Sequence, residues 1–429
     1  MTDTQVEAQD GVAEDAETTA LRQEIRSWLA SNWDPDLTVA EWWERLADDH
    51  WAVPTWPESD FGRGLSRGDA AVVAKEIAAA GAIGPPGGLG VMLAGPTIVA
   101  HGDEEQKRRY LRPIVTGQEA WCQLFSEPGA GSDLAGLAAR AVRDGDEWIV
   151  NGQKVWTSGG QIADRGMLLA RTDPDVPKHR GISWFAADMH QPGMDVRPLR
   201  EMTGRALFNE VFMTDIRVRD DDIIGGLNNG WAVANTTLMV ERMSLGAGGH
   251  GAASAAMPGT VAGDLEKRAG DFVRAPRSGS GDVMSDGAGA VVLALARKNA
   301  PITDAVLRQQ LVQLYEMQEI ARFANLRAKA ARAAGVKLTG AEPNIAKLSM
   351  TRITRLAAHL GLALQGPAGQ LWKDPHADPV MAELALFAPA VSIYGGTDEV
   401  QKNIIGERVL GLPAEPRTDK DVPFRDIPR

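Results

Sequence analysis

Apolar side chains recur at helical spacing through the first part of the chain. An amphipathic stripe begins with an i, i+4, i+7, i+8 series made by Leu21, Ile25, Trp28 and Leu29. Similar patterns, separated by prolines, cover about residues 40–50, 68–81 and 103–117. Residues 1–17 carry almost no large apolar side chain, which predicts a disordered tail. We therefore expect an N-terminal helical domain over residues 18–120, and we assign its clustered Trp42, Trp43, Trp51 and Trp56 to packing rather than to a cofactor site.

The pattern changes between about residues 121 and 222. Asp144-Gly145 and Asn151-Gly152 are two-residue signals typical of tight hairpin turns. Apolar and alternating runs predict strands at about residues 166–171, 181–187 and 207–218. Short strands with turn signals between them favour a small antiparallel β-domain over residues 121–222.

Helical periodicity returns after residue 230. The patterns cover about residues 302–334, 342–365, 376–391 and 398–410. Long helices with short connections are typical of a four-helix bundle. We expect this C-terminal bundle over residues 223–413, followed by a tail at 414–429. The order of helices, strands and helices predicts an α+β protein of three domains.

Composition excludes several classes of function. The chain of 429 residues has 45 Lys and Arg against 57 Asp and Glu, a formal net charge of −12. This balance disfavours nonspecific binding to nucleic acid or to an anionic membrane. No apolar run reaches the ~18–20 residues of a membrane span, and the acidic N-terminus lacks the features of a signal peptide. We expect a cytoplasmic protein without a metal site.

The single cysteine, Cys122, cannot form an intrachain disulfide. It adjoins the stretch that carries the candidate chemistry, which allows a redox role, but burial as a structural thiol is the favoured interpretation.

Two neighbouring stretches carry this candidate chemistry. The first, residues 123–133, is a short apolar strand that turns at glycines beside the hydroxyls of Ser126 and Ser132. The second, residues 151–160, bears Trp156 followed by Thr157 and Ser158. An aromatic face beside small hydrogen-bond donors could seat a flat heteroaromatic cofactor. On residue types alone, a glycine-rich turn beside a core tryptophan fits equally well.

Together these stretches resemble the acyl-CoA dehydrogenase family, whose middle domain has a T/S-E-P-x-x-G-S-D turn and a downstream N-G-x-K-x-W strand. Three further segments resemble motifs of the same family, in its order: Trp51–Pro57, Glu104–Leu111 and Tyr394–Gln401. The resemblance spans about residues 20 to 413. It implies the same three-domain fold, an FAD cofactor and an acyl-CoA substrate.

The reaction implied is removal of an α-proton by a base while the β-hydride passes to flavin, which leaves a trans-2-enoyl-CoA. Many members place the base directly after the tyrosine of the C-terminal turn, where this chain has Gly395. A minority, similar to isovaleryl-CoA and long-chain acyl-CoA dehydrogenases, place it on a bundle helix before an arginine. Glu241-Arg242 stands at that position. The resemblance therefore implies Glu241 as base, with Arg242 beside the substrate; the alternative is an ordinary surface ion pair.

The resemblance also assigns the cofactor contacts. It places Gln123, Leu124, Phe125 and Ser126 at the flavin ring edge, partly through backbone atoms. It places Trp156 and Thr157 beside the ring, Ser158 at flavin N5, and Ser132 on the CoA side. Thr397 and Glu399 open the last helix near flavin, although Thr397 could serve only as an N-cap.

Two motifs for the ADP half of flavin, which the family holds across a subunit interface, depart from the pattern. Arg297 and Asn299 match an R-K-x-F-G motif whose Phe-Gly is replaced by Ala300-Pro301. Gln365 and Gly366 stand in a glycine-rich segment with the glutamine displaced and one glycine replaced by proline. These departures favour a second hypothesis, a non-catalytic or half-site subunit of an α2β2 assembly. The main hypothesis is a homotetrameric dehydrogenase.

Other expectations follow from the resemblance. Electron-transfer flavoprotein is the expected electron acceptor, and an acyl-CoA oxidase is a third possibility that no residue decides. A Gly/Pro-rich segment at about residues 258–288 is longer than the family's usual crossing. We interpret it as a loop-like insertion that borders the acyl pocket and admits a bulky acyl group; a surface excursion without effect on the substrate is the alternative.

Overall fold

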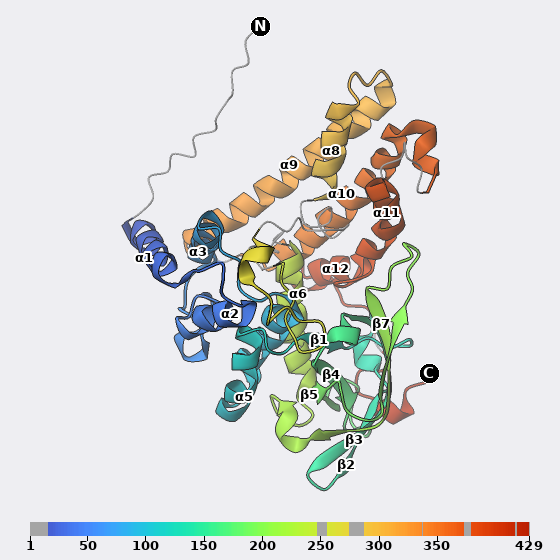
Figure 1. Cartoon of the computed structure of the whole chain (residues 1–429). Coiled ribbons are helices and arrows are strands. Elements are labelled where there is room, and N and C mark those ends of the chain that lie inside the picture. The colour runs from blue at the N-terminus through green and yellow to red at the C-terminus, as the bar shows by residue number, and fades with distance from the viewer. Residues whose placement is uncertain are drawn as a thin grey trace.

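The computed structural model describes residues 16–246, 255–273, 287–336, 338–372, 379–416 and 418–428 (Figure 1). Most of the tail expected at 1–17 lies outside these residues, but Ala16 and Glu17 already belong to the first helix. The N-terminal helices are α1 Ala16–Asn32, α2 Val39–Asp48, α3 Arg67–Ala79, α4 Gly95–His101 and α5 Glu104–Val115. Four were expected. Helix α4 was missed because Pro96 was taken as a break, whereas proline fits the first turn of a helix.

The starts of α2, α3 and α5 are fixed by side-chain caps. Thr38 and Glu41 form a reciprocal capping box at α2, and Asp103 and Gln106 form one at α5. The clustered tryptophans are buried as expected, with Trp42 and Trp43 fully enclosed. They belong to a core that extends to helix α6, Gly230–Gly246.

The middle of the chain forms one sheet. Its strands are β1 Trp121–Leu124, β2 Arg140–Asp144, β3 Glu147–Ser158, β4 Arg165–Arg171, β5 Ile182–Asp188, β6 Met194–Leu199, β7 Phe208–Arg219 and β8 Ile223–Ile224. The order is β6-β7-β3-β2-β4-β5-β8, with β1 added on β4. Most pairs are antiparallel, as expected, but β1 and β2 both pair with β4 in parallel. Strand β6 was missed, since its exposed, alternating residues include Pro198.

One expected hairpin is wrong. Asp144 pairs with Glu147 around the turn that Gly145 opens, as expected, but Asn151 and Gly152 lie inside the continuous strand β3. The ladder with β7 shifts register between Val150 and Gly152, which marks a bulge. A Cβ on Gly152 would lie 2.6 Å from the Cβ of Ala139, so the glycine permits this close approach of strands. The Asn151-Gly152 dipeptide, which predicted a hairpin turn, therefore marks a bulge in the long strand β3.

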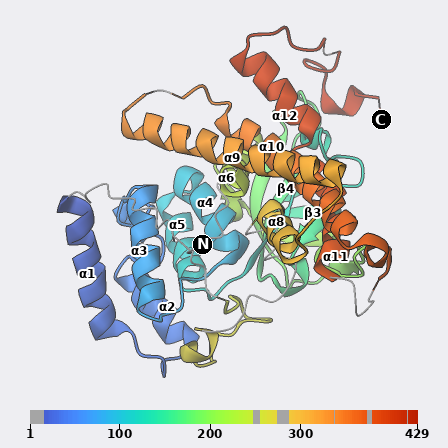
Figure 2. The ribbon, with the colours of Figure 1, turned by 90° about the horizontal axis from the view of Figure 1, so that it is seen from above.

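The helices after the sheet form the C-terminal part. They are α6, α8 Ala288–Lys298, α9 Ala305–Ala333, α10 Glu342–Leu364, α11 Pro379–Phe387 and α12 Asp398–Ile404. Helices α8 to α11 share one core. Seen from above, α6 lies between the N-terminal helices and the sheet, under α10 (Figure 2). Helix α6 therefore touches all three parts of the molecule.

The described part of the expected insertion is packed rather than loose. Residues 255–273, which we call the strap, lie along the N-terminal helices, where Ala269 is fully buried. The backbone N–H groups of Val39 and Ala40 donate to Lys267 and Leu265 of the strap. Residues 274–286 of the expected insertion lie outside the described part.

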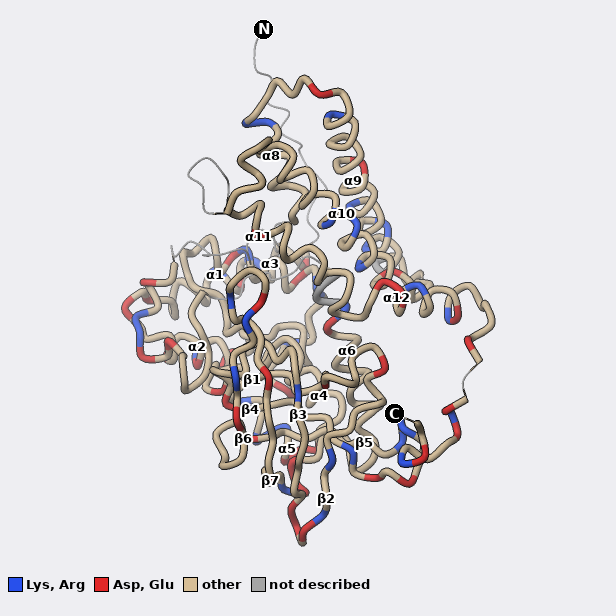
Figure 3. The backbone as a smooth tube through the Cα atoms, turned by 90° about the vertical axis from the view of Figure 1, so that its right-hand side faces the viewer, with Lys and Arg blue, Asp and Glu red and all other residues tan. Residues whose placement is uncertain are grey.

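The C-terminal residues fold back onto the sheet (Figure 3). Phe424 is buried, and the guanidinium of Arg171 lies 3.4 Å from the centre of its ring. Lys178 bonds both Asp419, at 2.6 Å, and Asp133, at 2.7 Å. Within the described residues, none of the helices is both long and apolar enough to cross a bilayer.

Candidate active site

The two motif stretches are joined by main-chain and side-chain bonds. The backbone N–H of Val155 donates to the carbonyl of Ser126 at 2.9 Å. The Lys154 Nζ donates to the carbonyl of Phe125 at 3.0 Å. The turn after β1 is thus held against β3, and the residues on both stretches form one site.

A buried ion pair supports this turn. Lys154 is fully buried, and its Nζ lies 2.8 Å from Glu127 Oε1. The Glu127 carboxylate also accepts from the backbone N–H groups of Ala138 and Ala139, at 2.6 and 2.9 Å. Burial lowers the pKa of Lys154, and the charge of Glu127 opposes that change. These two motif residues therefore organise the turn rather than face a ligand, a role that the sequence analysis missed.

The side chains that follow Lys154 are arranged to receive a flat ring. Trp156 is 58% exposed, unusual for so large an aromatic residue, and its φ of 61° turns the chain sharply at this point. Thr157 is buried, and its hydroxyl has no hydrogen-bond partner among the described residues. Ser158 is exposed at the end of the strand. An open indole face, an unused buried hydroxyl and an exposed hydroxyl fit the planar, polar-edged ring of a flavin.

The β1 residues assigned to cofactor binding point in different directions. Leu124 packs into the core of the sheet, and Phe125 packs into the core shared with the N-terminal helices. Only their backbone atoms can face the site. Gln123 and Ser126 are partly exposed beside it, and Ser132 is exposed beyond the turn.

Helix α6 brings Glu241 to this turn. The Gln123 side chain hydrogen-bonds the Glu241 carboxyl. Burial raises the pKa of Glu241 above the ordinary value of a glutamate, while Gln123 and Arg242 oppose the rise. Although Glu241 keeps some accessible surface, the protein packed around its carboxyl makes burial the larger effect. A carboxylate with a raised pKa is a stronger proton acceptor than one in water.

Arg242 lies near this carboxyl, and Arg408 of the C-terminal segment lies near Arg242. Burial lowers the pKa of Arg242, Glu241 opposes that change, and the nearby Arg408 adds to it. Gly395, with φ of 63°, places no carboxyl at the turn, and its carbonyl accepts from Gln401 at 2.9 Å. Thr397 caps α12 by accepting from the N–H of Val400, and Glu399 is exposed. The N-cap role considered for Thr397 is thus present.

The residues assigned to the ADP half of flavin form a separate group. Arg297 is exposed in the last turn of α8, and Asn299 Nδ2 donates to the carbonyl of Leu364 at 3.2 Å. This bond brings Arg297 and Asn299 near Gln365 and Gly366, which follow α10. In Figure 1 this end of the bundle lies far from β1. The single chain therefore does not unite the two sets of flavin residues.

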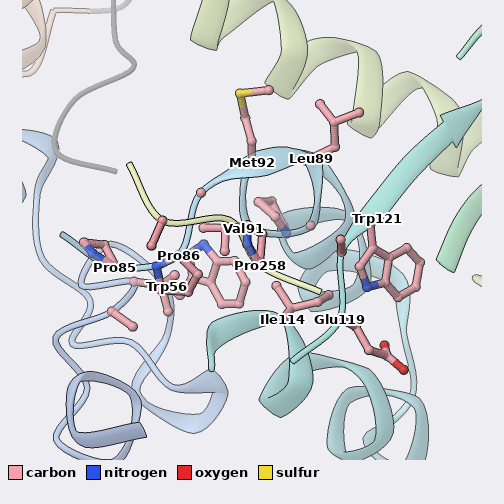
Figure 4. Close-up of a pocket in the computed structure, with 18 of the residues that line it drawn as sticks. Trp56, Pro85, Pro86, Leu89, Val91, Met92, Ile114, Glu119, Trp121 and Pro258 are labelled. Carbon is pink, nitrogen blue, oxygen red and sulfur yellow. The ribbon is translucent and has the colours of Figure 1, made fainter. Parts of the chain in front are cut away.

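A cavity of about 650 Å³ opens beside the site, between the N-terminal helices, the start of β1 and the strap (Figure 4). Its walls are mostly aromatic residues, prolines and aliphatic side chains. Ser158 also lines it. The cavity therefore adjoins the strand that carries Trp156.

Comparison with known families agrees with this architecture. The model of the acyl-CoA dehydrogenase N-terminal domain matches residues 2–118, that of the middle domain matches residues 122–216, and that of the C-terminal domain matches residues 290–410. Together they cover most of the chain.

Individual proteins resemble the chain over nearly its whole length. Acyl-CoA dehydrogenase IpdE1 of Mycobacterium tuberculosis is 33% identical over 415 residues, covering 92% of this chain and 98% of that protein. Acyl-CoA dehydrogenase FadE34 of the same organism is 36% identical over 399 residues, covering 93% of this chain but only 49% of FadE34.

Solved structures give the same result. The Tcur3481-Tcur3483 steroid ACAD is 27% identical with a TM-score of 0.68, covering 94% of this chain and 99% of that chain. The ChsE4-ChsE5 complex from Mycobacterium tuberculosis is 28% identical with a TM-score of 0.65 and the same coverage. The chain is an oxidoreductase that belongs to the acyl-CoA dehydrogenase family.

Proposed function

We propose that the chain binds FAD and catalyses α,β-dehydrogenation of an acyl-CoA thioester, with Glu241 as the base. The observation that carries the proposal is the position of Glu241, hydrogen-bonded to Gln123 of β1, where burial raises the pKa of Glu241. Position 395, where many family members carry the base, is a glycine and supplies no carboxyl. Acyl-CoA dehydrogenation needs one base beside the flavin ring, and we assign that role to Glu241.

The residues divide the chemical work among them. Glu241 takes the α-proton of the thioester, and the electron pair of that C–H bond forms the new double bond as the β-hydrogen leaves with its electrons. Flavin, when bound, supplies the acceptor for that hydride at N5. Trp156, Ser126, Thr157 and Ser158 would hold its ring. Arg242, beside the base, helps to orient the acyl-CoA.

The assembly and substrate follow from the relatives. The ChsE4-ChsE5 protein is named a complex, and the Tcur3481-Tcur3483 protein, whose name also joins two components, is named a steroid ACAD. These names favour a bulky, ring-bearing acyl group for this chain. Because the end of the bundle at which α8 and α10 end lies far from β1 in Figure 1, an oligomer would unite the two flavin half-sites. Electron-transfer flavoprotein is the proposed electron acceptor.

A second function, that of a half-site subunit with a different partner chain, draws support from the altered ADP-side motifs. The intact base and ring contacts favour the catalytic role. The two are distinguished by purifying the chain alone, counting flavin per protomer from the visible spectrum, and adding acyl-CoA without oxygen. Bleaching of the flavin with formation of a trans-2-enoyl-CoA supports the main proposal. A colourless chain that gains flavin and activity only with a second chain supports the half-site role.

A further inference from the structure

The cavity beside the site has rigid and mostly apolar walls. Trp56, Pro85, Pro86 and Ile114 contribute to one side, and Pro258 of the strap lies against them in Figure 4. Prolines and indoles lose little side-chain freedom when a ligand packs on them. The volume of about 650 Å³ is in the range of small-molecule sites. Such walls suit a rigid apolar ligand better than a flexible polar one.

The cavity lies next to the proposed reacting centre. Trp121, on its wall, is two residues before Gln123, so both side chains leave β1 on the same face, about 6.6–6.8 Å apart along the strand. Gln123 contacts Glu241. Leu89 and Met92, also on the wall, extend toward the neighbouring helix α6, which carries Glu241 (Figure 4). An acyl group whose α-carbon lies at Glu241 can therefore reach the cavity with its far end.

The strap fixes one wall. Asp264 is buried and accepts from the N–H of Met257 at 2.8 Å, which closes the strap into a tight loop. Asp164, at the start of β4, accepts from the N–H of Ala120 and from the hydroxyl of Thr260. A Cβ on Gly259 would lie 2.7 Å from the Cβ of Ala120, so the strap is seated directly on the sheet. The wall formed by Met257 and Pro258 is thus held from both sides.

The cavity wall includes an unused hydrogen-bond donor. Trp121 is 4% exposed, and its indole N–H has no acceptor within the described part of the chain. The ring is fixed by edge contact with Tyr110, at 5.7 Å between centroids, and by stacking on Trp184 at 6.5 Å. In Figure 4 the ring nitrogen lies on the edge of the indole nearer Ile114 and Glu119, which both line the cavity. Buried donors are nearly always paired in native proteins, so this one calls for an acceptor from a ligand or from water.

A second polar atom lies on the same wall. Glu119 bonds Arg165 through Oε1 at 3.1 Å, while its Oε2 is buried with no partner among the residues described. Burial raises the pKa of Glu119. The otherwise apolar cavity therefore has its unpaired polar atoms on the wall that Glu119 and Trp121 share.

We infer that the cavity binds the far end of the acyl group, and that this end is a rigid apolar ring system bearing an oxygen that accepts from Trp121 Nε1. This inference rests on the proposed function for the position of the thioester. The ring carbons pack against Trp56, Pro86 and Pro258. The oxygen accepts a hydrogen bond from the indole N–H. The cavity therefore binds this substrate more tightly than a hydrocarbon of the same shape that lacks the oxygen.

The test compares two ligands that differ by one oxygen: decalin-propanoyl-CoA and its derivative with a ketone on the ring remote from the side chain. Binding is measured by calorimetry on the flavin-loaded Glu241→Gln variant, in which turnover is blocked. We expect the ketone to bind roughly 3- to 10-fold more tightly, the effect of one neutral hydrogen bond. Equal dissociation constants in this otherwise unchanged cavity would overturn the inference.

Two matched variants locate the donor. Trp121→Phe keeps a ring but removes the N–H, and should reduce the preference for the ketone to near one. Trp148→Phe makes the same change at an indole that neither lines the cavity nor contacts Trp121, and should keep the preference. If Trp121→Phe keeps the preference, or Trp148→Phe loses it equally, the donor is assigned wrongly. Preferential binding without flavin reduction by the unmutated chain would support the cavity and refute the proposed reaction instead.

Discussion

Replacing Lys154 by methionine should destabilise the protein and release its flavin, although Lys154 touches neither ring nor substrate in our account. The substitution fills nearly the same volume but removes the Nζ that lies 2.8 Å from Glu127 and 3.0 Å from the carbonyl of Phe125. Glu127 is then a buried carboxylate without its counter-ion. Breaking one partner of a buried pair costs about 3–5 kcal/mol. Two backbone N–H groups still bind Glu127, which places the expected loss near the lower end, about 3 kcal/mol.

The measurement is urea unfolding followed by circular dichroism, with flavin retention scored after desalting. The midpoint should fall by the lost free energy divided by the measured slope, which rises with the surface exposed on unfolding. Lys75→Met, at an exposed lysine of α3, serves as the control and should change neither quantity.

The double variant Lys154→Met/Glu127→Gln should recover part of the stability. It removes the unpaired charge and keeps an amide oxygen for the N–H groups of Ala138 and Ala139. The ion-pair role of Lys154 is refuted if Lys154→Met unfolds at the same urea concentration as the unmutated chain. It is also refuted if the double variant is less stable than Lys154→Met by as much as Lys154→Met is less stable than the unmutated chain.

Three further outcomes are expected. Trp156→Ala should lower flavin retention while circular dichroism stays unchanged, since 58% of the side chain is exposed; loss of secondary structure in step with flavin would mark Trp156 as core instead. Glu241 must be deprotonated to act as base, and burial raises its pKa, so the acid limb of the kcat/KM profile should lie above the ordinary glutamate pKa of about 4.3. This limb should be absent from the residual activity of Glu241→Gln. An acid limb at or below about 4.3 would contradict the assignment of Glu241 as base. By linkage, Glu241 favours folding most below its ordinary pKa, and this contribution is lost as pH rises through the raised value. Phe424→Ala removes a buried ring from the Arg171 guanidinium, so it should lower the thermal unfolding midpoint measured by calorimetry. An unchanged midpoint would show that the C-terminal segment does not pack on the sheet in solution.

Periodicity predicted most elements but not their long-range contacts. The stripes that predicted α2, α3 and α5 are local patterns, and so is the Asp144-Gly145 turn. Asn151-Gly152 gave the same local signal, yet pairing with β7 keeps it inside a strand. A dipeptide does not reveal whether a distant strand will pair across it.

For the candidate site too, the sequence predicted single residues but not the contacts between distant segments. The motifs located Trp156 and Glu241, but not the bond between Glu241 and Gln123, which joins elements more than a hundred residues apart. Alternation along β1 could have shown that Leu124 faces away from the site. The strap was expected to be loose because it is rich in glycine; the structure uses Gly259 to seat the strap against Ala120.

The rate at which bound acyl-CoA bleaches the flavin under anaerobic stopped flow decides whether Glu241 is the base. We expect Glu241→Gln to keep its flavin and still bind acyl-CoA, but to reduce the flavin about 10²- to 10⁴-fold more slowly. Glu383→Gln, at a carboxylate on α11 paired with Arg205, should react at the unmutated rate. Flavin reduction by Glu241→Gln at the rate of the unmutated chain would exclude Glu241 as the base.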